Sequence, residues 1–148
     1  MAKSPYRIWI AEDNPADVYL IEEALRRHEF AYHLEIAENG EDMLNKIAAI
    51  DQDPAQSCPD LFLVDLNLPR RPGDEILERI RQSRRCSQVP EIVITSSDSP
   101  HDRGRARDLG ASFYFRKPAD LERYMAIGGI VREFLETQTG GVPHPSIC

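Results

Sequence analysis

Hydrophobic and polar positions alternate between two kinds of segment five times along the chain. Short apolar runs, which are typical of buried strands, occur at residues 7–11, 61–64, 92–94 and 113–115, and residues 32–37 form a second, more alternating strand pattern. After each run, apolar residues recur every three or four positions, which is the spacing of one face of a helix. The corresponding helices are predicted near residues 15–25, 43–50, 73–84, 102–109 and 119–136.

Local signals agree with this division. Asn14 followed by Pro15 fits a helix start, because Asn accepts hydrogen bonds from free backbone N–H groups and Pro fits the first turn. The dipeptide at residues 39–40, Asn-Gly, marks a turn. The helix predicted at residues 102–109 has only Ala106 and Leu109 as apolar positions, which indicates low local stability.

Five strand–helix units in series predict an α/β fold, a parallel sheet with helices on both faces. A chain of 148 residues suits one such domain, and its sequence contains neither an internal repeat nor a second domain. We expect the domain to occupy residues 1–136 and a flexible C-terminal tail, rich in Gly, Pro and Ser, to occupy residues 137–148.

Charged and hydroxyl side chains follow four of the five predicted strands. The first strand is followed by Glu12 and Asp13, the third by Asp65, the fourth by Thr95 and the fifth by Lys117. Ligands of open parallel sheets bind beyond the carboxyl ends of the strands, where the strand order switches. We therefore expect these five side chains to meet at one edge of the sheet.

Their chemistry suits a magnesium-assisted phosphoryl transfer. Three neighbouring carboxylates repel one another unless a cation lies among them, and Mg²⁺ prefers oxygen ligands. An exposed aspartate, with a pKa of about 3.9, needs no base to act as a nucleophile. With Mg²⁺ and Lys117 the formal charge of the three carboxylates is neutralised, so Asp65 can accept a phosphoryl group. Lys117 and the Thr95 hydroxyl would then contact different phosphoryl oxygens.

In order and spacing, these motifs resemble the receiver domain of two-component response regulators, of which the bacterial chemotaxis regulator is the familiar single-domain form. The motifs are "EDN" after the first strand, "DLNLP" with Gly73 eight residues past Asp65, Thr95 thirty past it and "KP" fifty-two past it. The resemblance covers roughly residues 6–135. It implies a (βα)5 flavodoxin-like three-layer sandwich whose five-stranded parallel sheet has strand order 2-1-3-4-5.

The resemblance also implies a role for each matching residue. Asp65 is the expected phosphoacceptor, and Mg²⁺ is the expected cofactor. Its ligands are expected from Glu12, Asp13, Asp65 and the backbone carbonyl of Asn67. Glu12 stands where many members carry Asp, which leaves direct or water-mediated contact with the metal open.

The remaining roles concern the phosphoryl group and the response to it. Lys117 is expected to contact the phosphoryl group, and the bond from Lys117 to Pro118 is expected to be cis. Thr95 is the expected switch hydroxyl, and Tyr114 is the expected switch aromatic on the fifth strand.

The implied function is signalling rather than enzymatic. The phosphoryl donor would be a sensor histidine kinase or a phosphotransfer protein. The segment "DLNLPRRPGDE" and the long loop before it resemble most the small regulators that partner bacterial phytochrome kinases. Phosphorylation is expected to switch the surface formed by the fourth helix, fifth strand and fifth helix for partner binding or dimerisation. The pair Gly128-Gly129, which permits close backbone approach, predicts a homodimer through the last helix.

Composition and charge argue against several other classes of protein. A net charge of -7 argues against DNA binding, which depends on neutralising phosphates, and against binding to anionic membranes. No apolar stretch approaches the length of a membrane span, and the N-terminus lacks a signal-peptide core. The three cysteines, Cys58, Cys86 and Cys148, show no metal-ligand spacing. They predict incidental thiols in a reduced, cytoplasmic protein.

Plainer alternatives remain open at this point. Asp65 can simply end a strand, Thr95 can be loop polarity, and Tyr114 can be an ordinary half-buried strand aromatic. A haloacid-dehalogenase-like phosphatase also uses Asp and Mg²⁺, but it needs an acid two residues after the nucleophile, where this chain has Asn67. A flavodoxin-like binding module needs a Gly-rich or hydroxyl-rich phosphate loop, where "EDNPAD" stands.

Overall fold

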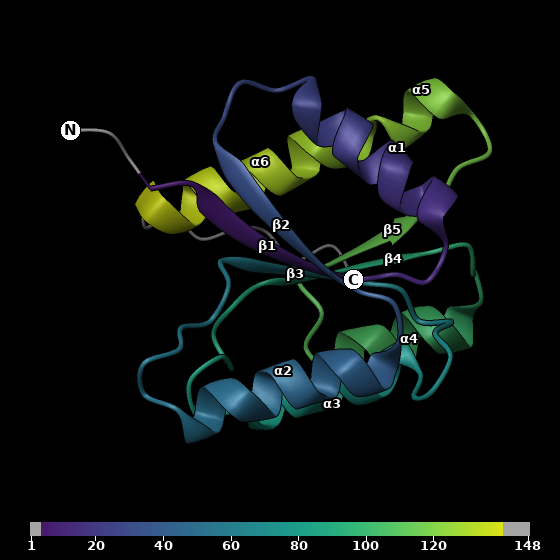
Figure 1. Ribbon diagram of the computed structural model, residues 1–148. Helices are drawn as coiled ribbons and strands as arrows, with labels where there is room; N and C mark the ends of the chain where they lie inside the picture. Colours follow the sequence, from purple (N-terminus) through teal and green to yellow (C-terminus); the bar gives the residue numbers. More distant parts are fainter. Residues whose placement is uncertain (1–3, 141–148) are drawn as a thin grey trace.

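The computed structural model describes residues 4–140 as a five-stranded parallel sheet between two layers of helices (Figure 1). The strand order is β2-β1-β3-β4-β5, which confirms the predicted fold class. The strands are β1 (Tyr6–Ala11), β2 (Tyr32–Ala37), β3 (Leu61–Val64), β4 (Glu91–Thr95) and β5 (Phe113–Arg116). The helices are α1 (Pro15–Arg26), α2 (Gly40–Gln52), α3 (Gly73–Gln82), α4 (Pro100–Asp108), α5 (Leu121–Tyr124) and α6 (Ala126–Gly140).

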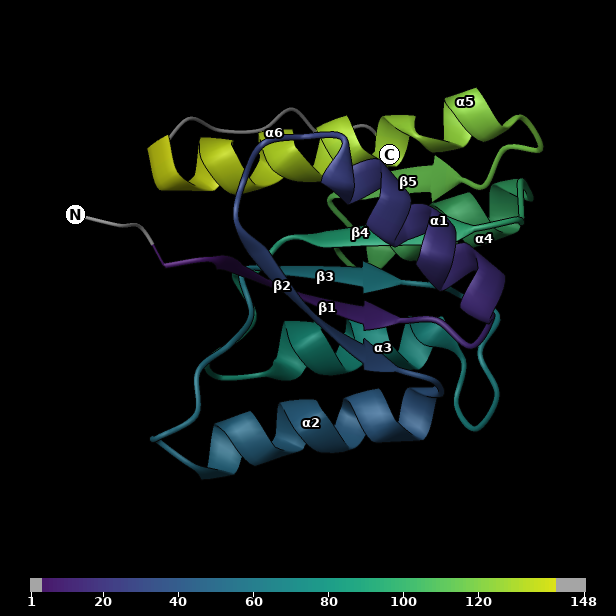
Figure 2. The same cartoon turned by 45° about the horizontal axis from the view of Figure 1, so that its top comes forward.

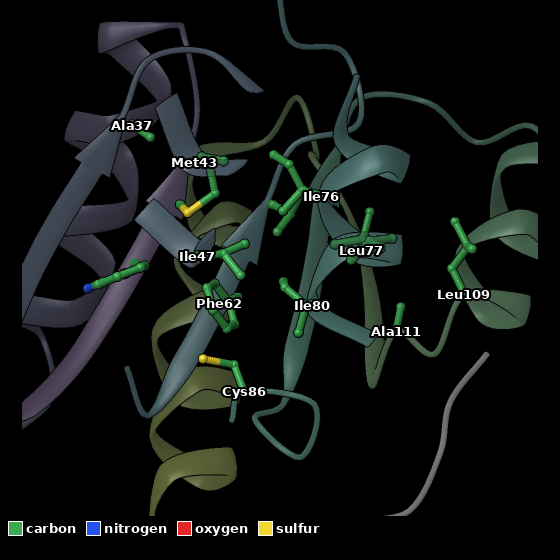
Figure 3. Packing of buried hydrophobic residues seen from close by; sticks show 14 of the residues in the cluster. Ala37, Met43, Ile47, Phe62, Ile76, Leu77, Ile80, Cys86, Leu109 and Ala111 are labelled. Carbon is green, nitrogen blue, oxygen red and sulfur yellow. The ribbon is translucent and has the colours of Figure 1, made fainter. Parts of the chain in front are cut away.

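Each face of the sheet packs against its own set of helices. Helices α1, α5 and α6 cover one face, and α2, α3 and α4 cover the other (Figures 1 and 2). Successive side chains of a strand point to opposite faces of the sheet. Leu61 and Leu63 therefore lie in the first core, on the side of α1 and α6, and Phe62 and Val64 lie in the second core, on the side of α2 and α3. Figure 3 shows the second core, in which Phe62 lies among side chains of α2 and α3.

Side-chain caps mark the starts of α1, α2 and α4. Asn14 accepts a hydrogen bond from the Ala16 N–H at 2.9 Å, which confirms the predicted start of α1. Asn39, predicted as part of a turn, caps α2 by accepting from the Asp42 N–H at 2.8 Å. Ser99 caps α4, so this helix begins at Pro100 rather than at residue 102.

The last predicted helix is two helices. Asp120 caps α5, and this short helix ends before α6 begins at Ala126. α6 then continues to Gly140, past the predicted end of the last helix at Glu136. Residues 141–148 of the expected tail lie outside the described residues. Within residues 4–140, no helix combines the length and apolarity that a bilayer crossing needs.

Gly128 packs against the chain's own first helix. A Cβ at Gly128 would lie 2.2 Å from the Ala24 carbonyl oxygen, whereas a Cβ at Gly129 would lie 3.5 Å from the His28 ring. The close approach predicted from the glycine pair is therefore between α1 and α6. The glycine pair is therefore no argument for a homodimer.

Replacing Gly128 by alanine is expected to lower the free energy of unfolding by about 1–3 kcal/mol, because the new methyl group overlaps backbone that cannot move aside cheaply. Gly129→Ala is the matched control. It adds the same methyl group at ordinary contact distance and gains helix propensity, so it is expected to be neutral or stabilising. Urea unfolding of both variants measures the difference, and equal stabilities would contradict the packing of α6 on α1.

The cysteine prediction is wrong for two of the three residues. Cys58, in the loop before β3, and Cys86, after α3, form a disulfide with Cα atoms 5.6 Å apart. Both segments lead into strands at the amino edge of the parallel sheet, so the fold brings them together although 28 positions separate them in sequence. Cys148 lies outside the described residues.

Candidate functional site

The predicted acidic residues lie together at the carboxyl edge of the sheet. Glu12 and Asp13 directly follow β1, and Asp65 directly follows β3. The Asp65 N–H donates to the Ala11 carbonyl at 3.0 Å, and the Glu12 N–H donates to the Ala37 carbonyl at 3.0 Å. Hydrogen bonding of the sheet thus extends one residue past the strands and holds both acids by their backbones.

Lys117 is the centre of the site. Its Nζ lies 2.7 Å from Glu12 Oε1, 2.9 Å from Asp65 Oδ2 and 3.0 Å from Asp17 Oδ2. Burial by itself lowers the pKa of Lys117, but hydrogen bonds to these three carboxylates raise it above the ordinary lysine value. The side chain is therefore a permanent cation that joins the end of β5 to the ends of β1 and β3.

Glu12, Asp13 and Asp65 form a cluster able to hold a cation. One carboxylate oxygen from each lies within 4.8 Å of the other two. Glu12 is 1% exposed and Asp65 is 4% exposed, whereas Asp13 is exposed. Burial, with the neighbouring Asp65 charge, raises the pKa of Glu12 to about 7. This donor set of carboxylate oxygens, with too little positive charge around it, fits a hard divalent cation.

Two residues of the site were missed by sequence reasoning. They are Asp17 of α1 and Tyr124 of α5, which are not among the predicted site residues. In the structure Asp17 Oδ2 accepts a hydrogen bond from the Lys117 ammonium, and the Tyr124 hydroxyl donates to Asp17 Oδ1 at 2.9 Å. Asp17 thus brings the carboxylates of the site to four, three of them in contact with the ammonium. With a bound divalent cation the formal charge of the site would be -1 rather than neutral.

The predicted switch residues lie beside the acidic cluster. Thr95, at the end of β4, is fully buried, and its Oγ1 accepts from the Ser97 N–H at 3.3 Å and the Asn67 side-chain amide at 3.5 Å. The Asn67 N–H donates to Asp65 Oδ1 at 3.0 Å. Asn67 therefore connects the acid to the hydroxyl.

Tyr114 holds the loop that follows Thr95. The Tyr114 ring is buried, and its hydroxyl donates to the Ser97 carbonyl at 2.9 Å. The Arg103 guanidinium of α4 lies 4.5 Å from the ring centroid. Tyr114 thus contacts both the β4–α4 loop and α4.

The predicted cis bond between Lys117 and Pro118 is not found, since all peptide bonds of the described residues are trans. The Lys117 N–H donates to the Thr95 carbonyl at 2.7 Å, and the ammonium reaches Asp65 with the trans bond in place. Trans is also the intrinsically preferred form of an X–Pro bond.

Solvent reaches the acidic cluster through an open depression of about 520 Å³. Its lining includes the four acids, Lys117 and Tyr124. The exposed side chain of Leu121 also borders it, as does Leu20 of α1. A group attached to another protein can therefore reach Asp65 from the side of α1 and α5.

Comparison with known proteins agrees with this geometry. The model of the response regulator receiver domain family matches residues 8–127. A probable methanogenesis regulatory protein, FilR2 of Methanothrix harundinacea, is 33% identical over 82% of this chain and 77% of its own length. Response regulator Rcp1 of Synechocystis sp. is 29% identical over 91% of this chain and 92% of its own.

Solved structures show the same fold over nearly the whole described chain. The phosphorylated cyanobacterial phytochrome response regulator RcpA superposes with a TM-score of 0.81, at 29% identity over 91% of this chain and 96% of its own. The Mn²⁺-bound form of Rcp1 superposes with a TM-score of 0.78, at 30% identity over 95% of this chain and 99% of its own. With the family match and the acidic edge of the sheet, these likenesses show that the chain belongs to the response regulator receiver domain family, a signalling module rather than an enzyme.

Proposed function

We propose that the chain accepts a phosphoryl group from phosphohistidine on Asp65 and passes the signal on through the surface of α4, β5 and the predicted fifth helix, which is α5 and α6 in the structure. The observation that carries this proposal is the position of the Asp65 carboxylate. It lies at the end of a central strand, bonded at 2.9 Å to the Lys117 ammonium and reached by an open depression. A carboxylate placed in this way is a nucleophile that a partner protein can approach.

Mg²⁺ is the cofactor that we propose for the transfer. Glu12, Asp13 and Asp65 would hold it, together with the backbone carbonyl of Asn67. When bound, it supplies positive charge for the phosphoryl oxygens and offsets the repulsion among the carboxylates. The existence of a Mn²⁺-bound form of the similar regulator Rcp1 supports a divalent metal as the cofactor.

In the transfer step, a carboxylate oxygen of Asp65 forms a bond to phosphorus while the bond between phosphorus and the histidine nitrogen breaks. The electron pair of the broken bond returns to the imidazole of the donor. Lys117 exchanges its hydrogen bond to Asp65 for one to a phosphoryl oxygen, and its fixed charge stabilises the transition state. Asp17 and Tyr124 keep the ammonium aligned from the side of α1.

The response begins at Thr95. An added phosphoryl group offers new acceptor oxygens next to Asn67, and the Thr95 hydroxyl can donate to one of them. This shift draws the β4–α4 loop inward, and Tyr114, whose hydroxyl holds that loop at Ser97, follows it. α4 is anchored by few apolar side chains, so a small bias at the loop changes its position.

The donor that we propose is a histidine kinase or phosphotransfer protein, and the likeness to RcpA supports a kinase of the bacterial phytochrome class. Its phosphohistidine would enter over α1 and α5, where Tyr19 and Leu121 are exposed apolar side chains. Phosphorylation would then favour a downstream protein partner or a homodimer on the surface of α4, β5, α5 and α6.

The proposal is tested by transfer from an autophosphorylated histidine kinase carrying labelled phosphate. With Mg²⁺ present, label is expected to move to the chain, and chelation of the metal is expected to stop it. An Asp65→Asn variant is expected to gain no label. Label that appears equally in the variant, or equally without metal, would contradict Asp65 as the acceptor or Mg²⁺ as its cofactor.

Replacing Thr95 by alanine is expected to leave phosphorylation in place but to remove the response. Phosphorylation of the wild-type chain is expected to change amide hydrogen exchange across the β4–α4 loop and α4, and Thr95→Ala is expected to abolish that change. Ser87→Ala, an exposed hydroxyl deletion near the opposite edge of the sheet, is the control. An unchanged exchange response in Thr95→Ala would remove this residue from the switch.

A further inference from the structure

The loop between β3 and α3 carries two arginines on backbone that arginine rarely adopts. Arg70 has φ 56° and Arg71 has φ 115°, and no other non-glycine residue of the described chain has positive φ. Side chains crowd the backbone in this region, whereas glycine fits it without strain. Strain of this kind persists where surrounding structure enforces it, and it is concentrated at functional sites.

Both ends of this loop meet at Asp65. The Gly73 N–H donates to the Leu66 carbonyl at 2.9 Å, and a Cβ at Gly73 would lie 2.1 Å from the Asp65 carbonyl oxygen. The tip of the loop rests on the start of α2, where the Gly40 N–H donates to the Pro69 carbonyl at 3.1 Å. Figure 2 shows the loop projecting at the end of the sheet to which β1 and β3 point.

The two side chains do little for the fold. Arg70 is exposed and has no hydrogen bond or ion pair within the described part of the chain. Arg71 reaches only Glu75, at 3.4 Å, with side chains 61% and 40% exposed, and such exposed pairs contribute little stability. Arg85, by contrast, donates to three backbone carbonyls, one near the end of α2 and two in the loop before β3. The backbone of the two arginines is therefore fixed by the surrounding structure, but their side chains contribute little to the stability of the fold.

We propose that Arg70 and Arg71 are a docking element for acidic side chains of the protein that donates the phosphoryl group. This inference rests on the proposed function. The chain has a net charge of -7 and its pocket is acidic, so an anionic phosphohistidine and acidic side chains around it are repelled on approach. Two guanidinium groups on a rigid loop beside Asp65 provide the opposing attraction and bind carboxylates in a defined geometry.

Two double variants separate charge from backbone strain. Arg70→Gly with Arg71→Gly removes both charges and relieves the strain, whereas Arg70→Lys with Arg71→Lys keeps the charges. Arg84→Ala with Arg132→Ala is the control, because it removes the same charge from α6 and from the segment after α3. The protein donor is whichever purified, autophosphorylated histidine kinase of the same genome labels the wild-type chain fastest, and acetyl phosphate is the small donor.

The glycine variant is expected to melt at a higher temperature than wild type and to accept phosphate from the kinase about tenfold more slowly at low salt. The deficit is expected to shrink as salt increases, because exposed charges are screened. Labelling by acetyl phosphate is expected to be unchanged. The lysine variant is expected to keep most of the kinase-dependent rate, and the control is expected to behave like wild type.

Equal kinase-dependent rates in wild type and the glycine variant would overturn the inference, as would an equal loss in the control. Labelling by acetyl phosphate without transfer from any kinase would also overturn it, because a phosphodonor protein would then not be the occupant. If neither donor labels Asp65 of the wild-type chain, the proposed function itself fails.

Discussion

Replacing Glu91 by glutamine is expected to stabilise the protein at pH 9 by roughly 3–5 kcal/mol, while leaving its stability at pH 4 nearly unchanged. Glu91 opens β4 at the amino edge of the sheet and is only 4% exposed. Its Oε2 has no hydrogen-bond partner within the described residues. Burial raises the pKa of Glu91 to about 8 from 4.5, and the charge of Arg81 opposes this only in part.

The direction of the effect follows from where the proton is held. Between pH 4.5 and about 8 the folded chain keeps a proton on Glu91 that the unfolded chain releases. The contribution to stability is therefore fully present below the unfolded pKa and is lost as the pH rises through the folded pKa. Glutamine cannot ionise, so the variant does not lose this stability. Its free energy of unfolding therefore exceeds that of wild type as the pH increases.

Urea unfolding of both proteins from pH 4 to pH 9 measures the difference. Glu78→Gln, an exposed change on α3, is the control for losing one negative charge. Parallel curves for wild type and Glu91→Gln would show that Glu91 is ionised and solvated in the folded chain, contrary to its burial.

Removing the disulfide between Cys58 and Cys86 is expected to lower the free energy of unfolding by about 3–4 kcal/mol, from the entropy of closing a loop of this length. For a chain of this size the loss corresponds to a fall in melting temperature of roughly 7–14 °C. The effect is smaller if other contacts already order the loop. Arg7 donates to the Cys58 carbonyl, and Arg85, next to Cys86, donates to the Asp53 carbonyl of the segment that leads to Cys58.

Thermal unfolding of a Cys58→Ser/Cys86→Ser variant, beside wild type with and without reductant, measures this contribution. Alkylation of the folded protein is expected to modify these two cysteines only after reduction. Cys148→Ser is the control for a change of thiol content. Free alkylation of Cys58 and Cys86 without reductant, or identical melting of all forms, would contradict the disulfide.

The sequence predicted best what depends on local pattern. β2 and β3 have the predicted bounds, because β2 alternates in polarity up to the turn at Asn39 and β3 is a clean apolar run that ends at Asp65. Glu12, Asp13, Asp65 and Lys117 share one edge because parallel strands bring their carboxyl ends together. Their roles in metal binding and phosphoryl transfer stay predictions.

Features that depend on pairing between distant elements were missed. The contact of Asp17 with Lys117 needs the angle at which α1 crosses the sheet. The disulfide needs two loops at the amino edge to coincide. Glu91 lies one position before the predicted start of its strand, so a pattern of apolar residues gives no sign that its carboxyl group is buried.

The most direct test of the account is the intact mass of the chain after incubation with acetyl phosphate and Mg²⁺. Wild type and an Asp108→Asn control, an exposed aspartate at the end of α4, are expected to gain the mass of one phosphoryl group. Asp65→Asn is expected to gain none, and neither is wild type after chelation of the metal. A gain that survives in Asp65→Asn, or that is absent from wild type with metal present, would contradict Asp65 as the phosphoacceptor.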